Sequence, residues 1–307
     1  REVAYNYNNK YPNKSKYYDE KFNNNISILA GRGMGKSSAL ITIISQIESN
    51  QYFKEVETKK NYIDIINPMI DPEDINENSD ILGWVITSLF EQANQLEQTD
   101  SKKSDLNYYF NIDNSIHHDL QEKKKELISY YSIYSKEYSN VVLNNSVNVH
   151  DYNSNLEDIL TFDYKLHKCF IEFINMIIKY KRDINRHTMK GLAGEKIEPL
   201  IYFFFDDVDI SSKHCANILM NILNFLCHPN IVVFISGDYD VFEKSMIKYF
   251  LNFTNYPQKE VSDEDIEASR GRSECFLKKV LPPTYRYRII GYTNEILFNL
   301  KYNENSD

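Results

Sequence analysis

The sequence has no long uncharged apolar segment and no apolar core near its start that would fit a secretory signal. Its longest apolar runs, 201–205 and 231–236, are as long as strands and far shorter than the roughly 18 residues that a membrane-spanning helix needs. Membrane-spanning and secreted classes are therefore not favoured. Because the first residue is Arg1 rather than Met, we expect the chain to be a piece of a longer protein.

Cysteine is scarce, and no pair has C-x-x-C spacing. This scatter favours reduced thiols and a cytoplasmic setting. Three of the cysteines have a histidine close by in sequence, so a zinc site is an alternative, but buried or half-buried thiols on helices are the favoured interpretation. The four cysteines are Cys169, Cys215, Cys227 and Cys275.

Basic residues are outnumbered, with 35 Lys and Arg against 44 Asp and Glu and a net charge of −9. This balance disfavours broad electrostatic binding to nucleic acid, although a local basic patch would still allow it. Asn, Lys, Ile and Tyr are abundant, which we interpret as genomic base composition rather than function.

Strand-like and helix-like segments alternate along most of the chain. The predicted strands are 26–30, 61–71 (ending at a proline), 200–210, 231–240 and 285–290. The predicted helices are 36–50, 80–98 (with Asp80 as N-cap), 116–140, 157–182, 211–227, 241–252 and a short one at 271–281. This order predicts an α/β fold, a three-layer αβα arrangement in which helices cover both faces of a parallel sheet.

The same reading divides the chain into five parts. They are an N-terminal arm (1–25), the first part of an α/β core (26–98), a mainly helical insertion (99–199), the second part of the core (200–292) and the start of a C-terminal region (293–307). Two polar stretches, 186–199 and 256–268, are predicted to be loops.

A glycine-rich loop lies between the first strand and the first helix, in "LAGRGMGKSSAL" (29–40). It matches G-x-x-x-x-G-K-[ST] except that Ala30 replaces the first glycine. In such a loop Lys36 would reach the β- and γ-phosphates of ATP, and Ser37 would ligate Mg²⁺. A flexible turn is the alternative. The predicted nucleotide-binding residues are Ala30, Gly31, Arg32, Gly33, Met34, Gly35, Lys36, Ser37 and Ser38.

Carboxylates follow the apolar strand "IYFFF" (201–205) at once. Ligands of open α/β sheets bind at the carboxyl ends of the strands, so these side chains are candidates for the site. Asp206 fits the Mg²⁺ shell, and Asp207 fits the base that polarises water. Asp209 is interpreted as a cap of the following helix.

The next apolar strand, "IVVFISGD", ends in Ser236. A polar residue here senses the γ-phosphate in nucleotide-switch ATPases, so Ser236 is a candidate, with Asp238 or plain turn chemistry at Gly237 as alternatives.

Arginines that could stabilise transition-state charge occur in two pairs. Arg270 and Arg272 follow a polar loop, which suits contact with a neighbouring subunit. Arg286 and Arg288 alternate on a strand and would share one face. A solvated surface role is the alternative for each.

Several nucleotide-binding classes lack their signatures. No Asn-Lys-x-Asp guanine reader follows a later strand, and no L-S-G-G-Q-like segment is present. Superfamily helicases usually carry Asp-Glu where this chain has Asp-Asp, and a nucleoside kinase seldom has an Asp-Asp-x-Asp strand end.

With these residues in order, the chain resembles the additional-strand P-loop ATPases of the AAA+/STAND/KAP group, over roughly 22–100 and 198–292. The segments that carry the resemblance are "LAGRGMGKSSAL", "IYFFFDDVDI", "IVVFISGDYD" and "FLKKVLPPTYRY". The resemblance implies a Mg²⁺-ATP-driven switch that assembles into oligomers or rings and often serves bacterial anti-phage defence with an effector protein. A narrower resemblance, to the ATPase subunit of the RADAR anti-phage system, implies an adenosine deaminase as that partner.

Two other functions stay open from the sequence. One is a DNA-associated ATPase of the replication-initiator or clamp-loader type, which the acidic balance does not support. The other is a scaffold that binds nucleotide without hydrolysing it, which the intact Lys36, Ser37, Asp206 and Asp207 disfavour.

Overall fold

The computed structural model describes residues 22–49, 63–75, 80–102, 114–143, 156–188, 198–253 and 261–290. Within these residues five strands form one sheet in the order β2-β3-β4-β1-β5, and every neighbouring pair is parallel. The α/β class predicted from the sequence is confirmed. The strands are β1 (Asn25–Leu29), β2 (Ile65–Ile70), β3 (Ile201–Phe205), β4 (Ile231–Gly237) and β5 (Arg286–Arg288).

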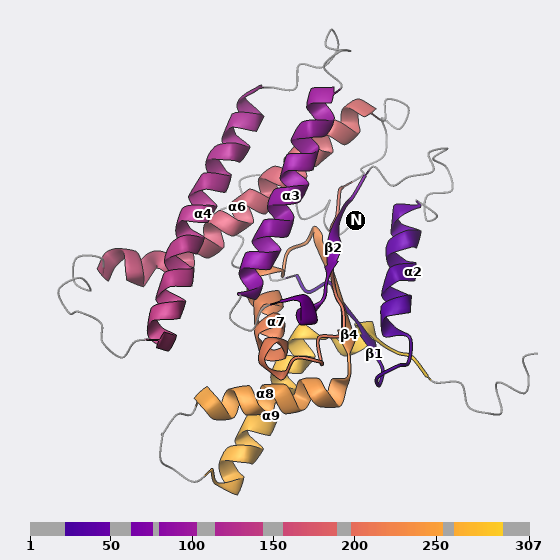
Figure 1. The fold of residues 1–307 in the computed structure, drawn as a ribbon, viewed down its shortest axis with the longest axis vertical. Coiled ribbons are helices and arrows are strands. Elements are labelled where there is room, and N and C mark those ends of the chain that lie inside the picture. Colours follow the sequence, from indigo (N-terminus) through magenta and orange to yellow (C-terminus); the bar gives the residue numbers. More distant parts are fainter. Residues whose placement is uncertain are drawn as a thin grey trace, which may run out of the picture.

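Helices lie on both faces of this sheet, giving the three layers expected (Figure 1). One face carries α2, and the other carries α3 and α7. α4 packs against α3 and α6, while α8 and α9 pack together beside α7. The helices are α2 (Lys36–Glu48), α3 (Ile81–Lys102), α4 (Asn114–Leu143), α6 (Leu156–Thr188), α7 (Ser212–Phe225), α8 (Tyr239–Phe253) and α9 (Asp263–Val280).

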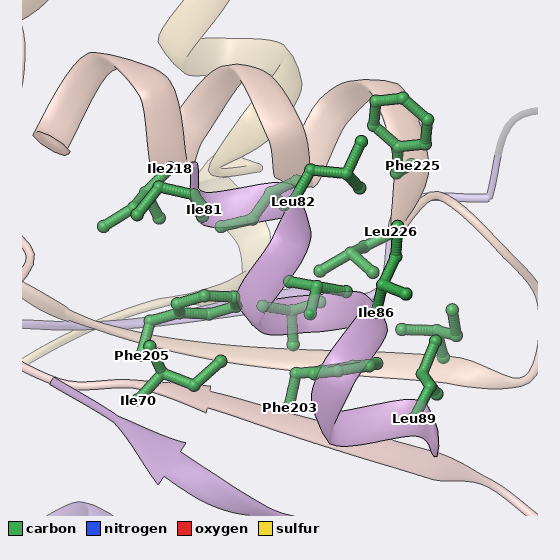
Figure 2. Close-up of a cluster of buried hydrophobic side chains, with 14 of the residues drawn as sticks. Ile70, Ile81, Leu82, Ile86, Leu89, Phe203, Phe205, Ile218, Phe225 and Leu226 are labelled. Carbon is green, nitrogen blue, oxygen red and sulfur yellow. The ribbon is translucent and has the colours of Figure 1, made fainter. Parts of the chain in front are cut away.

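The larger core lies between the sheet and α3 (Figure 2). Side chains alternate across a strand, so Phe203 and Phe205 of β3 point to this face and are fully buried. They meet one apolar stripe of α3, whose residues recur at helical spacing. The stripe consists of Ile81, Leu82, Val85, Ile86 and Leu89.

The smaller core lies between the sheet and α2. Phe204 and Phe234 stack with their ring centroids 5.1 Å apart, and Leu40 and Ile47 of α2 are buried in the same cluster. This packing fixes α2 directly behind the glycine-rich loop, so both cores serve to position the carboxyl edge of the sheet.

Three predicted boundaries are wrong. Pro68 lies inside β2 instead of ending it, and the register shifts there between Ile66 and Met69. β2 is an edge strand, where a residue without an N–H is tolerated.

The second boundary is the start of α9. This helix begins at Asp263, within the stretch predicted as a loop, because Ser262 and Asp265 form a capping box.

The third concerns 186–199, predicted to be an exposed loop. α6 continues to Thr188, and Glu198 is 4% exposed. Glu198 accepts hydrogen bonds from Arg182 at 2.7 and 3.2 Å, which ties the end of α6 to the start of β3. Residues 189–197 lie outside the described part of the chain.

Buried asparagines tie the strands to carbonyls of neighbouring segments, which base composition alone does not account for. Asn25 donates to the carbonyl of Val280 at 2.7 Å, and Asn230 donates to that of Pro199 at 2.9 Å. Asn67 donates to Tyr202 at 2.9 Å. A side-chain amide that pairs with a carbonyl replaces the hydrogen bonds lost on burial.

The thiols are free, and three of them, Cys169, Cys215 and Cys227, are buried as expected, while Cys275 is exposed. Within the described residues no group of three potential metal ligands occurs, and no helix is both long and apolar enough to cross a membrane.

Candidate functional site

The loop between β1 and α2 needs glycine for its backbone. Gly33 and Gly35 have φ values of 78° and 85°, in the left-handed region that favours glycine. A methyl group built on either residue would meet no atom within 4 Å. The requirement is therefore conformational, and the space around the loop is open.

The helix that follows presents an uncapped N-terminus. α2 begins at Lys36 with Gly35 as its N-cap, and among the described residues no side chain caps it with a hydrogen bond. The first amides of a helix have no acceptor within the helix, and the helix dipole adds a partial positive charge there. A phosphate is a suitable acceptor at such a position.

Ala30, which replaces the first glycine of the pattern, does not need to be glycine. Its φ is not positive, and its N–H donates to the carbonyl of Gly237 at 3.1 Å. Ala30 therefore joins the start of the loop to the end of β4, and the replacement is compatible with the loop.

Lys36 links the loop to the acidic end of β3. Its Nζ lies 3.2 Å from Oδ1 of Asp207 and 3.4 Å from the carbonyl oxygen of Gly31. The lysine side chain is 5% exposed and that of Asp207 is 28% exposed. The contact with Asp207 is an ion pair without hydrogen-bond geometry, because Oδ1 accepts no hydrogen bond.

Three residues at the ends of β3 and β4 form a closed hydrogen-bonded group. The Ser236 hydroxyl donates to Oδ1 of Asp206 at 2.5 Å and accepts from the N–H of Asp207 at 2.8 Å. The same N–H also lies 2.9 Å from Oδ1 of Asp206. Asp206 and Ser236 are buried, at 3% and 0% exposure.

Asp207 has an unusual backbone for a residue other than glycine, with φ at 42°. Aspartate tolerates this region better than most residues, but the conformation still needs support from its surroundings. That support comes from Ser236, whose carbonyl accepts from the N–H of Val208 at 3.1 Å, and from the hydrogen bonds above.

Asp209 is not the helix cap that the sequence suggested. α7 is capped by Ser211, whose side chain accepts from the N–H of His214 at 3.3 Å. Oδ1 of Asp209 is buried without a hydrogen bond. Burial raises the pKa of this carboxyl, Lys36 opposes the rise, and Asp207 adds to it. Asp209 thus lies close enough to Lys36 and Asp207 for their charges to act on its carboxyl. The sequence signal for this was its position in the Asp-Asp-x-Asp segment.

A hydrated Mg²⁺ fits the oxygen donors present at this edge of the sheet. Mg²⁺ keeps several waters and needs only one or two protein ligands beside phosphate oxygens. Asp206 offers a carboxylate and Ser37 a partly exposed hydroxyl. The exposed Ser38 uses its carbonyl to accept from Thr42 at 2.8 Å, so its backbone is part of α2.

The two arginines proposed to act on a neighbouring subunit are exposed on α9. Arg270 pairs with Glu267 at 3.1 Å on the same helix and is 56% exposed. Among the contacts of the described residues, none joins Arg270 or Arg272 to the loop at 30–38. The predicted role of these arginines, in contact with a neighbouring subunit, stays a prediction.

Arg286 has a structural role at the C-terminus of α9. Its guanidinium donates to the carbonyls of Leu281 at 2.8 Å and Leu277 at 3.3 Å, and lies 4.7 Å from the ring centre of Tyr239. Arg288, two residues on, is exposed. Arg286 is thus removed from the candidates for transition-state stabilisation.

Comparison of the chain with protein-family models gave no match, and comparison with curated proteins gave none either. The function is therefore inferred from the geometry of the site.

Proposed function

We propose that this chain binds Mg²⁺-ATP, hydrolyses it to ADP and phosphate, and changes conformation with the bound nucleotide as part of an oligomer. The observation that carries the proposal is the ion pair between Lys36 and Asp207, 3.2 Å long. It brings the glycine-rich loop and the acidic end of β3, which are far apart in the sequence, into one site.

Each residue of the site has a chemical task in this proposal. The loop amides and Lys36 would hold the phosphates, and Ser37 with Asp206 would hold Mg²⁺, which neutralises charge on the β- and γ-phosphates. Asp207 would accept a proton from water while the water oxygen bonds to the γ-phosphorus. The bond between that phosphorus and the ADP oxygen would break in the same step. Asp209 would keep the surroundings of Lys36 acidic.

The strand order supports the same proposal. β4 lies between β1, which leads into the loop, and β3, which ends in the carboxylates. An additional strand at this place is what the resemblance to additional-strand P-loop ATPases implies. Ligands of open α/β sheets bind at the carboxyl ends of such strands.

The oligomer and its partner rest on the resemblance. Arg270 and Arg272 are exposed on α9, which suits contact with a neighbouring subunit in a ring. The proposal includes an effector of anti-phage defence, such as an adenosine deaminase, and a cytoplasmic setting, which the free thiols support.

The test is ATP turnover per subunit, measured with Mg²⁺ over a range of protein concentrations. We expect turnover to rise with concentration, because an arginine supplied by a neighbour acts only in the assembled state. Lys36→Ala should lower turnover on the order of 100-fold or more, since a charged donor to the transition state is lost.

Lys168→Ala is the matched control, because Lys168 is exposed and pairs with Glu172 on the surface of α6, a different helix from the one that carries Arg270 and Arg272. Its turnover should equal that of the wild type. ATP binding without turnover at any concentration would favour a nucleotide-bound scaffold, and absence of ATP binding would overturn the proposal.

A further inference from the structure

The hydroxyl of Ser236 is committed to the carboxylate of Asp206 and to the backbone N–H of Asp207. Its oxygen donates to Oδ1 of Asp206 at 2.5 Å and accepts from the N–H of Asp207 at 2.8 Å. A serine hydroxyl has a single proton to donate. While that proton is shared with Asp206, Ser236 has none left for a phosphate oxygen.

The same contacts fix the orientation of Asp206. Oδ1 receives two hydrogen bonds, from the Ser236 hydroxyl and from the N–H of Asp207 at 2.9 Å. Among the described residues, none donates a hydrogen bond to Oδ2 of Asp206. The carboxylate is thus anchored through one oxygen, and the other is left for water of a hydrated cation.

Ser236 also supports the backbone of Asp207. Asp207 has φ at 42°. Its N–H donates to the hydroxyl of Ser236, and the N–H of Val208 donates to the carbonyl of Ser236. A strained residue keeps such a conformation only where its neighbours hold it. One serine on β4 therefore orients the side chain of Asp206 and the backbone of Asp207 on β3.

We infer that Ser236 is a positioning residue that sets Asp206 for Mg²⁺ and Asp207 for water, and not a sensor of the γ-phosphate. This inference rests on the proposed function, because it assigns Ser236 a task within that site. It also predicts a result of its own: without the hydroxyl, more Mg²⁺ is needed to tighten ATP binding, while binding of ATP without metal is unchanged.

The experiment measures equilibrium binding of ATP to the full chain, first in EDTA and then at increasing Mg²⁺. For Ser236→Ala we expect the Mg²⁺ concentration for half-maximal tightening to rise about tenfold, the effect of losing one charge-assisted hydrogen bond. Affinity in EDTA should stay within about twofold of the wild type. Ser236→Thr keeps the hydroxyl, so its Mg²⁺ concentration for half-maximal tightening should equal that of the wild type.

Ser27→Ala is the matched control. Ser27 is 0% exposed on the neighbouring strand β1, and its hydroxyl donates to the carbonyl of Tyr285 at 3.5 Å. It should bind Mg²⁺-ATP as the wild type does, which separates a specific effect from the loss of any buried serine.

Three outcomes would overturn the inference. An unchanged Mg²⁺ requirement in Ser236→Ala, with ATP bound by the wild type, would refute it and leave the proposed function standing. A Ser236→Ala variant that binds ATP and ADP equally, with its Mg²⁺ requirement unchanged, would instead assign Ser236 to phosphate sensing. Absence of ATP binding to the wild type would overturn both.

Discussion

The ammonium of Lys36 and the carboxylate of Asp207 are paired at 3.2 Å, so the two groups proposed to act on ATP neutralise each other's charge. A phosphate that enters the loop would compete with Asp207 for the ammonium of Lys36. The exchange would release the carboxylate for water in the same step that seats the nucleotide, which couples binding to readiness for hydrolysis.

Asp207→Asn is predicted to tighten ATP binding several-fold while lowering turnover on the order of 100-fold or more. The amide cannot accept the proton of water and no longer competes with phosphate for Lys36. Asparagine tolerates a left-handed backbone as aspartate does, so the fold should persist. Equilibrium binding and turnover, measured on one preparation, check both parts.

The same variant should be less stable without nucleotide, by roughly 1–3 kcal/mol, because a 5% exposed ammonium loses its charged partner. Saturating ATP should recover most of the loss. Unchanged turnover in Asp207→Asn would refute the role of Asp207 as base, and weaker ATP binding would refute the competition.

Asp209→Asn is predicted to raise the melting temperature at pH 7 more than at pH 4, in EDTA without nucleotide. Burial raises the pKa of Asp209 above its ordinary value of 3.8. The folded chain therefore holds this proton more tightly than the unfolded chain, and stability is lost as the pH rises from 3.8 through the raised pKa. The amide has no proton to lose. An equal shift at both pH values would contradict a raised pKa.

Arg270→Ala with Arg272→Ala is predicted to lower turnover on the order of 1000-fold at high protein concentration without changing the melting temperature. Both side chains are exposed, and Arg270 pairs with Glu267 on the surface of α9. Mixing this variant with Lys36→Ala should restore part of the turnover, because each subunit then supplies what the other lacks. No restoration would exclude an arginine shared across subunits.

Arg286→Ala serves as the contrast to these two. It should lower stability by about 1–2 kcal/mol, because it leaves the carbonyls of Leu281 and Leu277 without their donor. Its loss of turnover should follow its loss of folded protein, with no restoration on mixing.

Cys275 is predicted to be the only one of the four cysteines that iodoacetamide modifies quickly in the native chain at pH 8. Burial raises the pKa of Cys169 and of Cys215 from 9.0 to about 12, which leaves about 1000-fold less reactive thiolate. Cys227 is buried as well. Peptide mass spectrometry over a time course would report each site, and early modification of Cys215 would show that α7 opens.

Local signals in the sequence were enough for the elements that carry the site. Gly33 and Gly35 mark the turn before α2, and the apolar run at 201–205 marks a strand buried on both faces. These features are set by the backbone and by burial within a few residues, so they can be read without knowing the rest of the fold.

Features set by distant partners could not be read in this way. The order of strands depends on pairing between segments far apart, and Pro68 is acceptable only because β2 turned out to be an edge. Asp209 and Ser211 both suit a helix cap by composition, and only the geometry selects Ser211. The bridging role of Ser236 likewise needs β3 and β4 side by side.

The backbone of Asp207 restricts which acid can occupy this place in any descendant of the chain. Asp207 has φ at 42°, in the left-handed region. Apart from glycine, asparagine and aspartate tolerate this region best, because their side chains are short and polar. A glutamate would carry the same charge on a longer stem and would strain the turn. Evolution toward an Asp-Glu pair would thus require the turn after β3 to be rebuilt first, because the main chain at Asp207 favours aspartate over glutamate.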